Sequence, residues 1–347
     1  MRKQLFIYLS AALFVTNAFG QDAHFTQYFL APQLINPSSF GVINSFEAGI
    51  QYKGQWNSFT KGYTTYAAFA NKSFKKEKDI NSSKAYMSAG LNVLYDQAGS
   101  SQLTHFKVEL PVNVTKKLSE FSFLTAGLYL GFGQLAIKKD DFTWGNQFDG
   151  YQYNPTFNSN ELNRLQTKNY LDAGLGLNFV TLRKVKDLTD ISTPKNIVGF
   201  SINHLNKPNY SLYNTQALGI RINFHEQYYI DIKNTFYSLV PSIMVQYQSK
   251  AYEVIFGTYL RRSFRENAEG KGTKHLSFGA FYRLNDMCAL SCLFELNKYT
   301  IGLNYDFNVS KLLKSSKSFG GLEITLKMNS PFKYSNNETK AFNGKVL

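Results

Sequence analysis

The feature that most constrains the fold is an alternation of apolar and polar residues that recurs along the chain. In residues 106–114, FKVELPVNV, every even position is apolar and most odd positions are polar. Successive side chains of a β-strand point to opposite faces, so the pattern predicts a strand with one apolar and one polar face. Residues 87–95, 171–179 and 299–306 show the same alternation.

The amino-terminal residues have the features of a secretory signal peptide. Arg2 and Lys3 precede an apolar run from Leu5 to Val15, and Ala18-Phe19-Gly20 forms a small-x-small cleavage site. A membrane-spanning helix needs about 20 apolar residues, and this run is roughly half as long. We therefore predict a signal peptide over residues 1–20, export, and a mature chain that begins at Gln21.

Strand length separates two all-β folds that both show alternation. Soluble β-sandwich strands run to about 5–6 residues, whereas strands of about 9–11 residues cross an outer membrane. The alternating segments here have the longer length, and the chain has 23 Tyr and 30 Phe residues that suit aromatic girdles at the two interfaces. We predict an all-β transmembrane barrel in the outer membrane, with about 14 antiparallel strands.

The domain organisation expected from the sequence has four parts. These are the signal peptide (1–20), an amino-terminal plug-like or docking segment (21–44), the transmembrane β-barrel (45–328) and a polar carboxy-terminal tail (329–347). The longest connection, residues 134–169, is expected to face the exterior, because such loops are longer outside the cell.

Polar residues on the inward faces of the strands are candidates for contacts within a lumen. Those expected to point inward are Glu109, Asn113, Asp172, Asn178, Asn304 and Glu323. A buried carboxylate requires a cationic partner. For Glu323, strand parity makes Lys53 and Arg221 candidates, although the sequence gives neither distance.

The sequence contains no recognisable catalytic or metal-binding motif, so we expect no enzyme, no cofactor and no metal. Its five histidines are scattered outside any hydrolase or zinc-protease frame. Cys288 and Cys292 have no histidine nearby and are expected to face lipid beside Leu290. The net charge of +14 could suit nucleic acid, but export argues against that partner and favours anionic lipid headgroups or acidic proteins.

The stretch that follows the signal peptide, QDAHFTQYFLAPQLINPSSFG (21–41), has no strand period. It resembles the front motif of the PorP/SprF family of type IX secretion-associated outer-membrane proteins. That motif reads roughly Gln-Asp-Pro-x-Phe-Ser-Gln-Tyr, followed by Leu-x-x-Asn-Pro-Ala-x-x-Gly. The matching residues are Gln21, Asp22, Phe25, Gln27, Tyr28, Asn36, Pro37 and Gly41.

The resemblance extends over most of the chain. Tyr52 to Trp56 resembles the family's Tyr-Arg-x-Gln-Trp, and Tyr305-Asp306-Phe307, Ser310-Lys311-Leu312 and Glu323 match near the end. The departures are Ala23 for Pro, Ala31 for Asn, Ser38 for Ala and Gly321-Leu322 for Ser-His. The front motif is fairly specific, and the departures affect only details of the amino-terminal segment and the last strand.

The resemblance implies a non-enzymatic barrel that supports type IX secretion or surface retention of a large partner, such as a gliding-type adhesin, through that partner's C-terminal domain. Other components of the secretion machinery and outer-membrane lipid are further implied partners. The residues expected to contact cargo, or to act as a plug, are Gln21, Asp22, Phe25, Gln27, Tyr28, Asn36 and Pro37. Two alternatives stay open: a barrel transporter for a small hydrophobic or nutrient ligand, and a purely structural surface anchor.

Overall fold

The computed structural model describes residues 22, 24–56, 61–75, 84–99, 102–138, 142–158, 167–182, 194–212, 216–265, 273–310, 316 and 318–332. The predicted signal peptide, Gln21 and most of the carboxy-terminal tail lie outside these residues. No helix in the described part of the chain is long and apolar enough to cross a membrane.

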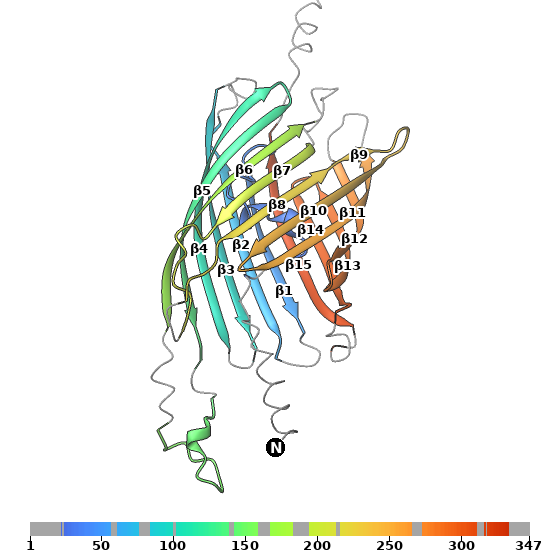
Figure 1. Cartoon of the computed structure of the whole chain (residues 1–347). Helices are drawn as coiled ribbons and strands as arrows, with labels where there is room; N and C mark the ends of the chain where they lie inside the picture. Colours follow the sequence, from blue (N-terminus) through green and yellow to red (C-terminus); the bar gives the residue numbers. More distant parts are fainter. Residues whose placement is uncertain are drawn as a thin grey trace, which may run out of the picture.

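The chain forms a closed antiparallel β-barrel of 14 strands, as the alternation predicted. The wall consists of β1 (Asn44–Gln55), β2 (Tyr63–Ser73), β3 (Tyr86–Ala98), β4 (Leu103–Ser119), β5 (Ser122–Ala136), β6 (Lys168–Leu182), β7 (Pro194–Asn203), β8 (Arg221–Tyr228), β10 (Tyr237–Gln248), β11 (Ala251–Arg265), β12 (Thr273–Arg283), β13 (Met287–Leu296), β14 (Tyr299–Asn308) and β15 (Phe319–Pro331). A two-residue strand, β9 (Ile230–Asp231), pairs with the end of β10. Each wall strand pairs with its neighbours along the chain, and β1 with β15 closes the ring (Figure 1).

The two faces of the wall follow the alternation in the sequence. On β6, Leu171 exposes 70% of its surface on the outside, whereas its neighbour Asp172 exposes 1% and points inward. The outer face of β13 carries exposed Leu290 together with free Cys288 and Cys292, as expected for lipid-facing thiols. Closing the sheet leaves no unpaired edge in the membrane, which is the condition for a β-structure to span lipid.

The wall of the barrel runs from Asn44 of β1 to Pro331 of β15. Asn44 of β1 pairs with Pro331 of β15, so the last strand extends past the expected boundary at residue 328. The extension arises because Asn329 and Ser330 continue the ladder opposite Glu47 and Phe46. Since successive strands alternate in direction, the long connection between β5 and β6 lies at the end of the barrel opposite Asn44. Its short 3-10 helix, η4 (Gly145–Gln147), projects away from the wall in Figure 1.

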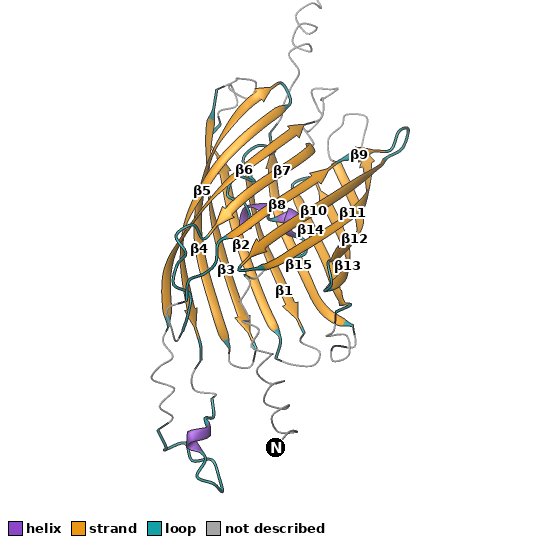
Figure 2. Ribbon diagram, viewed as in Figure 1, coloured by secondary structure: helices purple, strands orange, loops and turns teal. Residues whose placement is uncertain are grey.

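The amino-terminal segment, defined here as residues 22–43, lies inside the barrel. Two 3-10 turns, η1 (Tyr28–Leu30) and η2 (Pro32–Leu34), appear within the ring of strands in Figure 2. Its buried side chains include Phe25, Thr26, Gln27, Tyr28, Leu30, Ala31, Gln33, Asn36, Ser38, Phe40 and Val42. Pro32 and Pro37 lack a backbone N–H, which favours this irregular course over a strand.

Candidate functional site in the barrel lumen

The first anchor of the amino-terminal segment is the carboxylate of Glu323 on β15. Its two oxygens accept hydrogen bonds from the backbone N–H groups of Thr26, at 2.8 Å, and Gln27, at 3.0 Å. The ammonium of Lys53 on β1 lies 2.9 Å from the same carboxylate. A buried carboxylate is stable only with such partners, so the segment and the wall jointly satisfy its charge.

Further polar contacts surround this anchor. The ammonium of Lys53 donates to the carbonyl oxygen of His24 at 3.1 Å, and the hydroxyl of Thr26 donates to Asp306 at 3.1 Å. The Asn304 amide holds the same Asp306 carboxylate at 2.6 Å. The Gln27 amide nitrogen donates to Ser291 at 2.8 Å. Side chains from β1, β13, β14 and β15 therefore converge on residues 24–27.

The second anchor binds the carboxylate of Asp22. The guanidinium of Arg221 and the imidazole Nε2 of His204 each lie 2.7 Å from Asp22 Oδ2. Burial raises the pKa of the Asp22 carboxyl, but the charges of His204 and Arg221 outweigh burial and hold that pKa well below its usual range. Asp22 is therefore ionised at neutral pH.

An ion network on the wall supports the second anchor. The Nδ1 atom of His204 lies 2.9 Å from Asp172, and the Lys107 ammonium lies 3.1 Å from Asp172 and 2.7 Å from Glu109. The Tyr129 hydroxyl also donates to Asp172, at 3.0 Å. This carboxylate orients the His204 ring so that its second nitrogen faces Asp22.

The third anchor is Asn36, which the wall contacts from two strands. Its amide nitrogen donates to the carbonyl oxygens of Leu177, at 3.0 Å, and Phe200, at 3.3 Å. The Asn113 amide donates to the carbonyl oxygens of Pro37, at 3.3 Å, and Phe40, at 3.2 Å. These bonds give the Asn-Pro pair of the front motif a physical role in fixing the course of the segment.

Two glycines of the wall let the segment approach at this point. A Cβ atom on Gly176 would lie 2.0 Å from Asn36 Oδ1, and one on Gly127 would lie 2.8 Å from the Pro37 carbonyl oxygen. Any side chain at either position would meet the segment. The absence of a side chain at Gly127 of β5 and at Gly176 of β6 is therefore part of the site.

An apolar contact completes the set. Tyr28, Phe29 and Leu30 pack against the inner face of strands β10 to β13. The buried apolar wall residues there are Val240, Met244, Ile255, Tyr259, Phe281, Met287, Ala289 and Leu293. The inner face of these strands is therefore mixed, because apolar side chains that the amino-terminal segment covers lie beside buried polar ones such as Ser242, Glu253 and Ser291.

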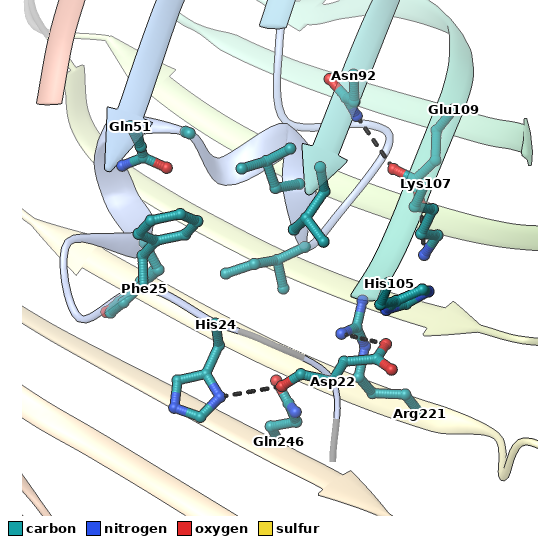
Figure 3. A pocket seen from close by; sticks show the side chains of 15 residues that line it. Asp22, His24, Phe25, Gln51, Asn92, His105, Lys107, Glu109, Arg221 and Gln246 are labelled. Atoms are coloured by element: carbon teal, nitrogen blue, oxygen red, sulfur yellow. Dashed lines mark hydrogen bonds and ion pairs between the residues drawn. The ribbon is translucent and has the colours of Figure 1, made fainter. Parts of the chain in front are cut away.

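A small cavity of about 40 Å³ remains between the segment and the wall. Figure 3 shows Asp22, His24, Phe25, His105 and Arg221 around it, with Arg221 directed at Asp22. A water molecule needs about 10–15 Å³, so the cavity has room for a few waters. Its lining is mixed: apolar side chains such as Phe25, Leu34 and Leu94 lie beside the charged groups of Asp22, Lys107, Glu109 and Arg221.

The polar residues selected from the sequence all lie in the lumen. Glu109, Asn113, Asp172, Asn178, Asn304 and Glu323 are buried there. Of the selected amino-terminal residues, Asp22, Phe25, Gln27, Tyr28, Asn36 and Pro37 belong to the segment inside the barrel, and Gln21 lies outside the described residues. Of the two cations considered for Glu323, Lys53 forms the ion pair, while Arg221 binds Asp22 instead.

Sequence reasoning did not assign His204 and Lys107 to the site. Their inward parity was readable, but the stagger of strands β4 to β7 decides that Lys107 and His204 both meet Asp172. The described residues contain no group of three or more His, Cys, Asp or Glu side chains arranged to hold a metal ion.

Solved outer-membrane proteins are among the structures similar to this chain, at low identity. The Ralstonia pickettii toluene transporter TbuX is 9% identical, with a TM-score of 0.45 over 87% of this chain and 94% of that one. BamA from Haemophilus ducreyi lacking POTRA domains 1–3 is 8% identical, with a TM-score of 0.40 over 82% of this chain and 70% of that one. No curated protein matches the chain significantly.

The family of the chain follows from a match over most of its length. Residues 17–328 match the family model described as type IX secretion system membrane protein PorP/SprF. The matched region includes the whole described amino-terminal segment and nearly all of the barrel wall. The chain belongs to the PorP/SprF family of type IX secretion system membrane proteins and is an outer-membrane β-barrel.

Proposed function

We propose that this protein is a non-enzymatic barrel that supports type IX secretion or surface retention of one large partner, such as a gliding-type adhesin, through the partner's C-terminal domain. Family membership supports the secretion role. The observation that carries the mechanism is the amino-terminal segment in the lumen. Thr26 binds Glu323 of β15, Asp22 binds Arg221 of β8, and Asn36 binds backbone carbonyls of β6 and β7.

In this proposal the amino-terminal segment is a plug. Its anchors are hydrogen bonds and ion pairs, which a competing polypeptide of similar polarity can replace one at a time. The residues selected from the sequence, Asp22, Gln27 and Asn36 among them, then hold the plug, and the wall residues that bind them are available to cargo once the plug moves. The barrel therefore stays sealed when no partner is present.

The lengths of the connections indicate which end of the barrel faces the exterior. The longer connections of outer-membrane barrels face the exterior, so the end that carries the long β5–β6 connection faces outward. Asp22 lies toward that end, because Arg221 opens β8 and His204 follows β7 there. A surface partner would approach the second anchor first.

Deletion of the gene in the native host, followed by proteomics of the cell surface and the culture fluid, tests this role. We expect one large surface protein with an export-type C-terminal domain to disappear from the surface, and the wild-type gene to restore it. An unchanged set of exported proteins together with altered uptake of a small ligand would instead move the assignment to transport.

Removal of residues 21–41 tests the contribution of the segment separately. We expect the truncated barrel to assemble, because its wall strands begin at Asn44. We expect the partner to be lost from the cell surface. Cargo retained on the surface at the wild-type level would count against a role for the segment. The heat-dependent gel mobility of folded barrels is the control for assembly.

A further inference from the structure

The second anchor is a carboxylate-binding site that the chain fills with its own side chain. Arg221 and His204 contact one oxygen of Asp22, and no backbone hydrogen bond to that carboxylate supplements them in the described structure. Arg221 and His204 both belong to the end of the barrel where the wall strands β7 and β8 meet. The receptor is thus formed by the wall, and the ligand is supplied by the segment.

Arg221 has unused binding capacity. Its side chain is only 6% exposed, its Nε atom has no hydrogen-bond partner, and it lines the cavity of about 40 Å³ beside Asp22. A guanidinium binds carboxylates best through two parallel N–H groups. Asp22 contacts the Nη1 atom, so a carboxylate that takes the place of Asp22 can pair with two N–H groups of the guanidinium where Asp22 uses one.

The charge of the site identifies the ligand class. Without Asp22, the cations Arg221 and Lys107 remain beside the carboxylates of Asp172 and Glu109, and the Nε2 atom of His204 loses its carboxylate partner. A single carboxylate restores the charge that Asp22 supplies, whereas a doubly charged phosphate would add further repulsion from the two remaining carboxylates.

We propose that the Arg221–His204 site binds a carboxylate of the partner polypeptide after Asp22 withdraws, so that Asp22 acts as an internal substitute for the partner's acid. This inference rests on the proposed function. The carboxylate can come from an acidic side chain or from the carboxyl terminus of the partner, and the experiment below separates the two sources.

Chemical rescue with acetate tests the site directly. Asp22→Ala removes the internal carboxylate and leaves a space that joins the existing cavity. With full-length protein in detergent, we expect ¹³C-acetate to bind this variant saturably, whereas wild-type protein shows no saturable binding. Adding Arg221→Gln should weaken acetate binding by about tenfold or more, because charge-assisted bonds to the guanidinium are lost.

Two further arms extend the test. Arg221→Lys in the Asp22→Ala background keeps the charge, and we expect intermediate binding; it also replaces Arg221→Gln if that variant does not fold. Inorganic phosphate should compete poorly with acetate. The proposed site would be overturned if acetate did not bind Asp22→Ala. It would also be overturned if acetate bound Asp22→Ala and Asp22→Ala/Arg221→Gln equally.

Pentaglycine peptides separate the sources of the carboxylate. One peptide has a free carboxyl terminus, one is amidated, and one is amidated with a single internal Asp. Competition with acetate by the first or the third identifies the source, and failure of both would overturn a peptide ligand. Failure of the secretion role is distinguishable, because it would appear as normal surface proteins in the gene deletion while acetate still bound.

Discussion

The ammonium of Lys53 lies 2.9 Å from the carboxylate of Glu323, and the two residues are direct partners in the register of β1 and β15. They join the first strand to the last across the line where the barrel closes. The same carboxylate accepts two backbone N–H groups of the amino-terminal segment. One buried ion pair therefore links barrel closure to the position of the segment.

Lys53→Met should strongly destabilise the folded barrel. The substitution leaves Glu323, which is fully buried, without its nearest cation, and breaking such pairs costs about 3–5 kcal/mol. Urea unfolding in lipid vesicles, followed by tryptophan fluorescence, measures the free energy of unfolding. The double variant Lys53→Met/Glu323→Gln should recover part of the loss, and a double variant less stable than Lys53→Met would contradict this account.

Gly176→Leu should displace the amino-terminal segment from the wall. The new side chain would occupy the space of Asn36 and the Pro37 ring, since even a Cβ lies 2.0 Å from the Asn36 amide oxygen. The readout is maleimide labelling of Ala31→Cys, which is 1% exposed in the folded protein, after Cys288 and Cys292 are replaced by Ala. We expect labelling to accelerate by an order of magnitude or more.

Gly131→Ala is the matched control for that experiment. The three atoms nearest to a Cβ there belong to Val108, Glu109 and Tyr129 of the wall, so labelling of residue 31 should stay slow. Equal labelling in both variants would mean that the glycine at 176 does not position the segment.

Acid should weaken the second anchor only at low pH. Because the pKa of Asp22 is held below its usual range, the anchor's contribution is complete above about pH 4 and is lost as the pH falls through the depressed value. The charged groups that act on the Asp22 carboxylate are led by His204, Arg221 and, further away, Lys107, and His105 lines the same cavity. Planar-bilayer conductance should stay low from pH 7 to pH 5 and show more open events below pH 4.

Asp22→Asn supplies the comparison for the acid response. It removes the charge at every pH, so open events should already be frequent at pH 7 and change less on acidification. A wild-type response centred near pH 6 would indicate that another group controls the segment.

Arginine on the outer face should cost stability according to depth. Leu130 lies within β5 and exposes 65% of its surface to the outside, whereas Leu118 lies near the end of β4. We expect Leu130→Arg to lower the free energy of unfolding by about 2–4 kcal/mol and Leu118→Arg by about 0–1 kcal/mol. If unfolding in lipid vesicles showed the same loss of free energy for both variants, Leu130 would not lie deeper in the hydrocarbon region than Leu118.

The strands of the wall were predictable because the period of a strand is two. Asp172 and Leu171 illustrate the limit of that reasoning, since parity assigns each to a face but not to a partner. The sequence could nominate both Lys53 and Arg221 for Glu323, and it could not choose between them. It also could not show which part of the inner wall would be apolar, because the segment that covers Met244 and Tyr259 is distant in the chain.

The amino-acid sequence by itself determined the strands, the face on which each side chain lies and the family motif of residues 21–41. Backbone geometry fixes these properties locally, residue by residue. Only the tertiary structure decided that Asp22 meets Arg221 and that Thr26 meets Glu323, because ring closure and strand stagger set which inward side chains share a level of the lumen. The contacts that support function are therefore long-range ones, and no local pattern specifies them.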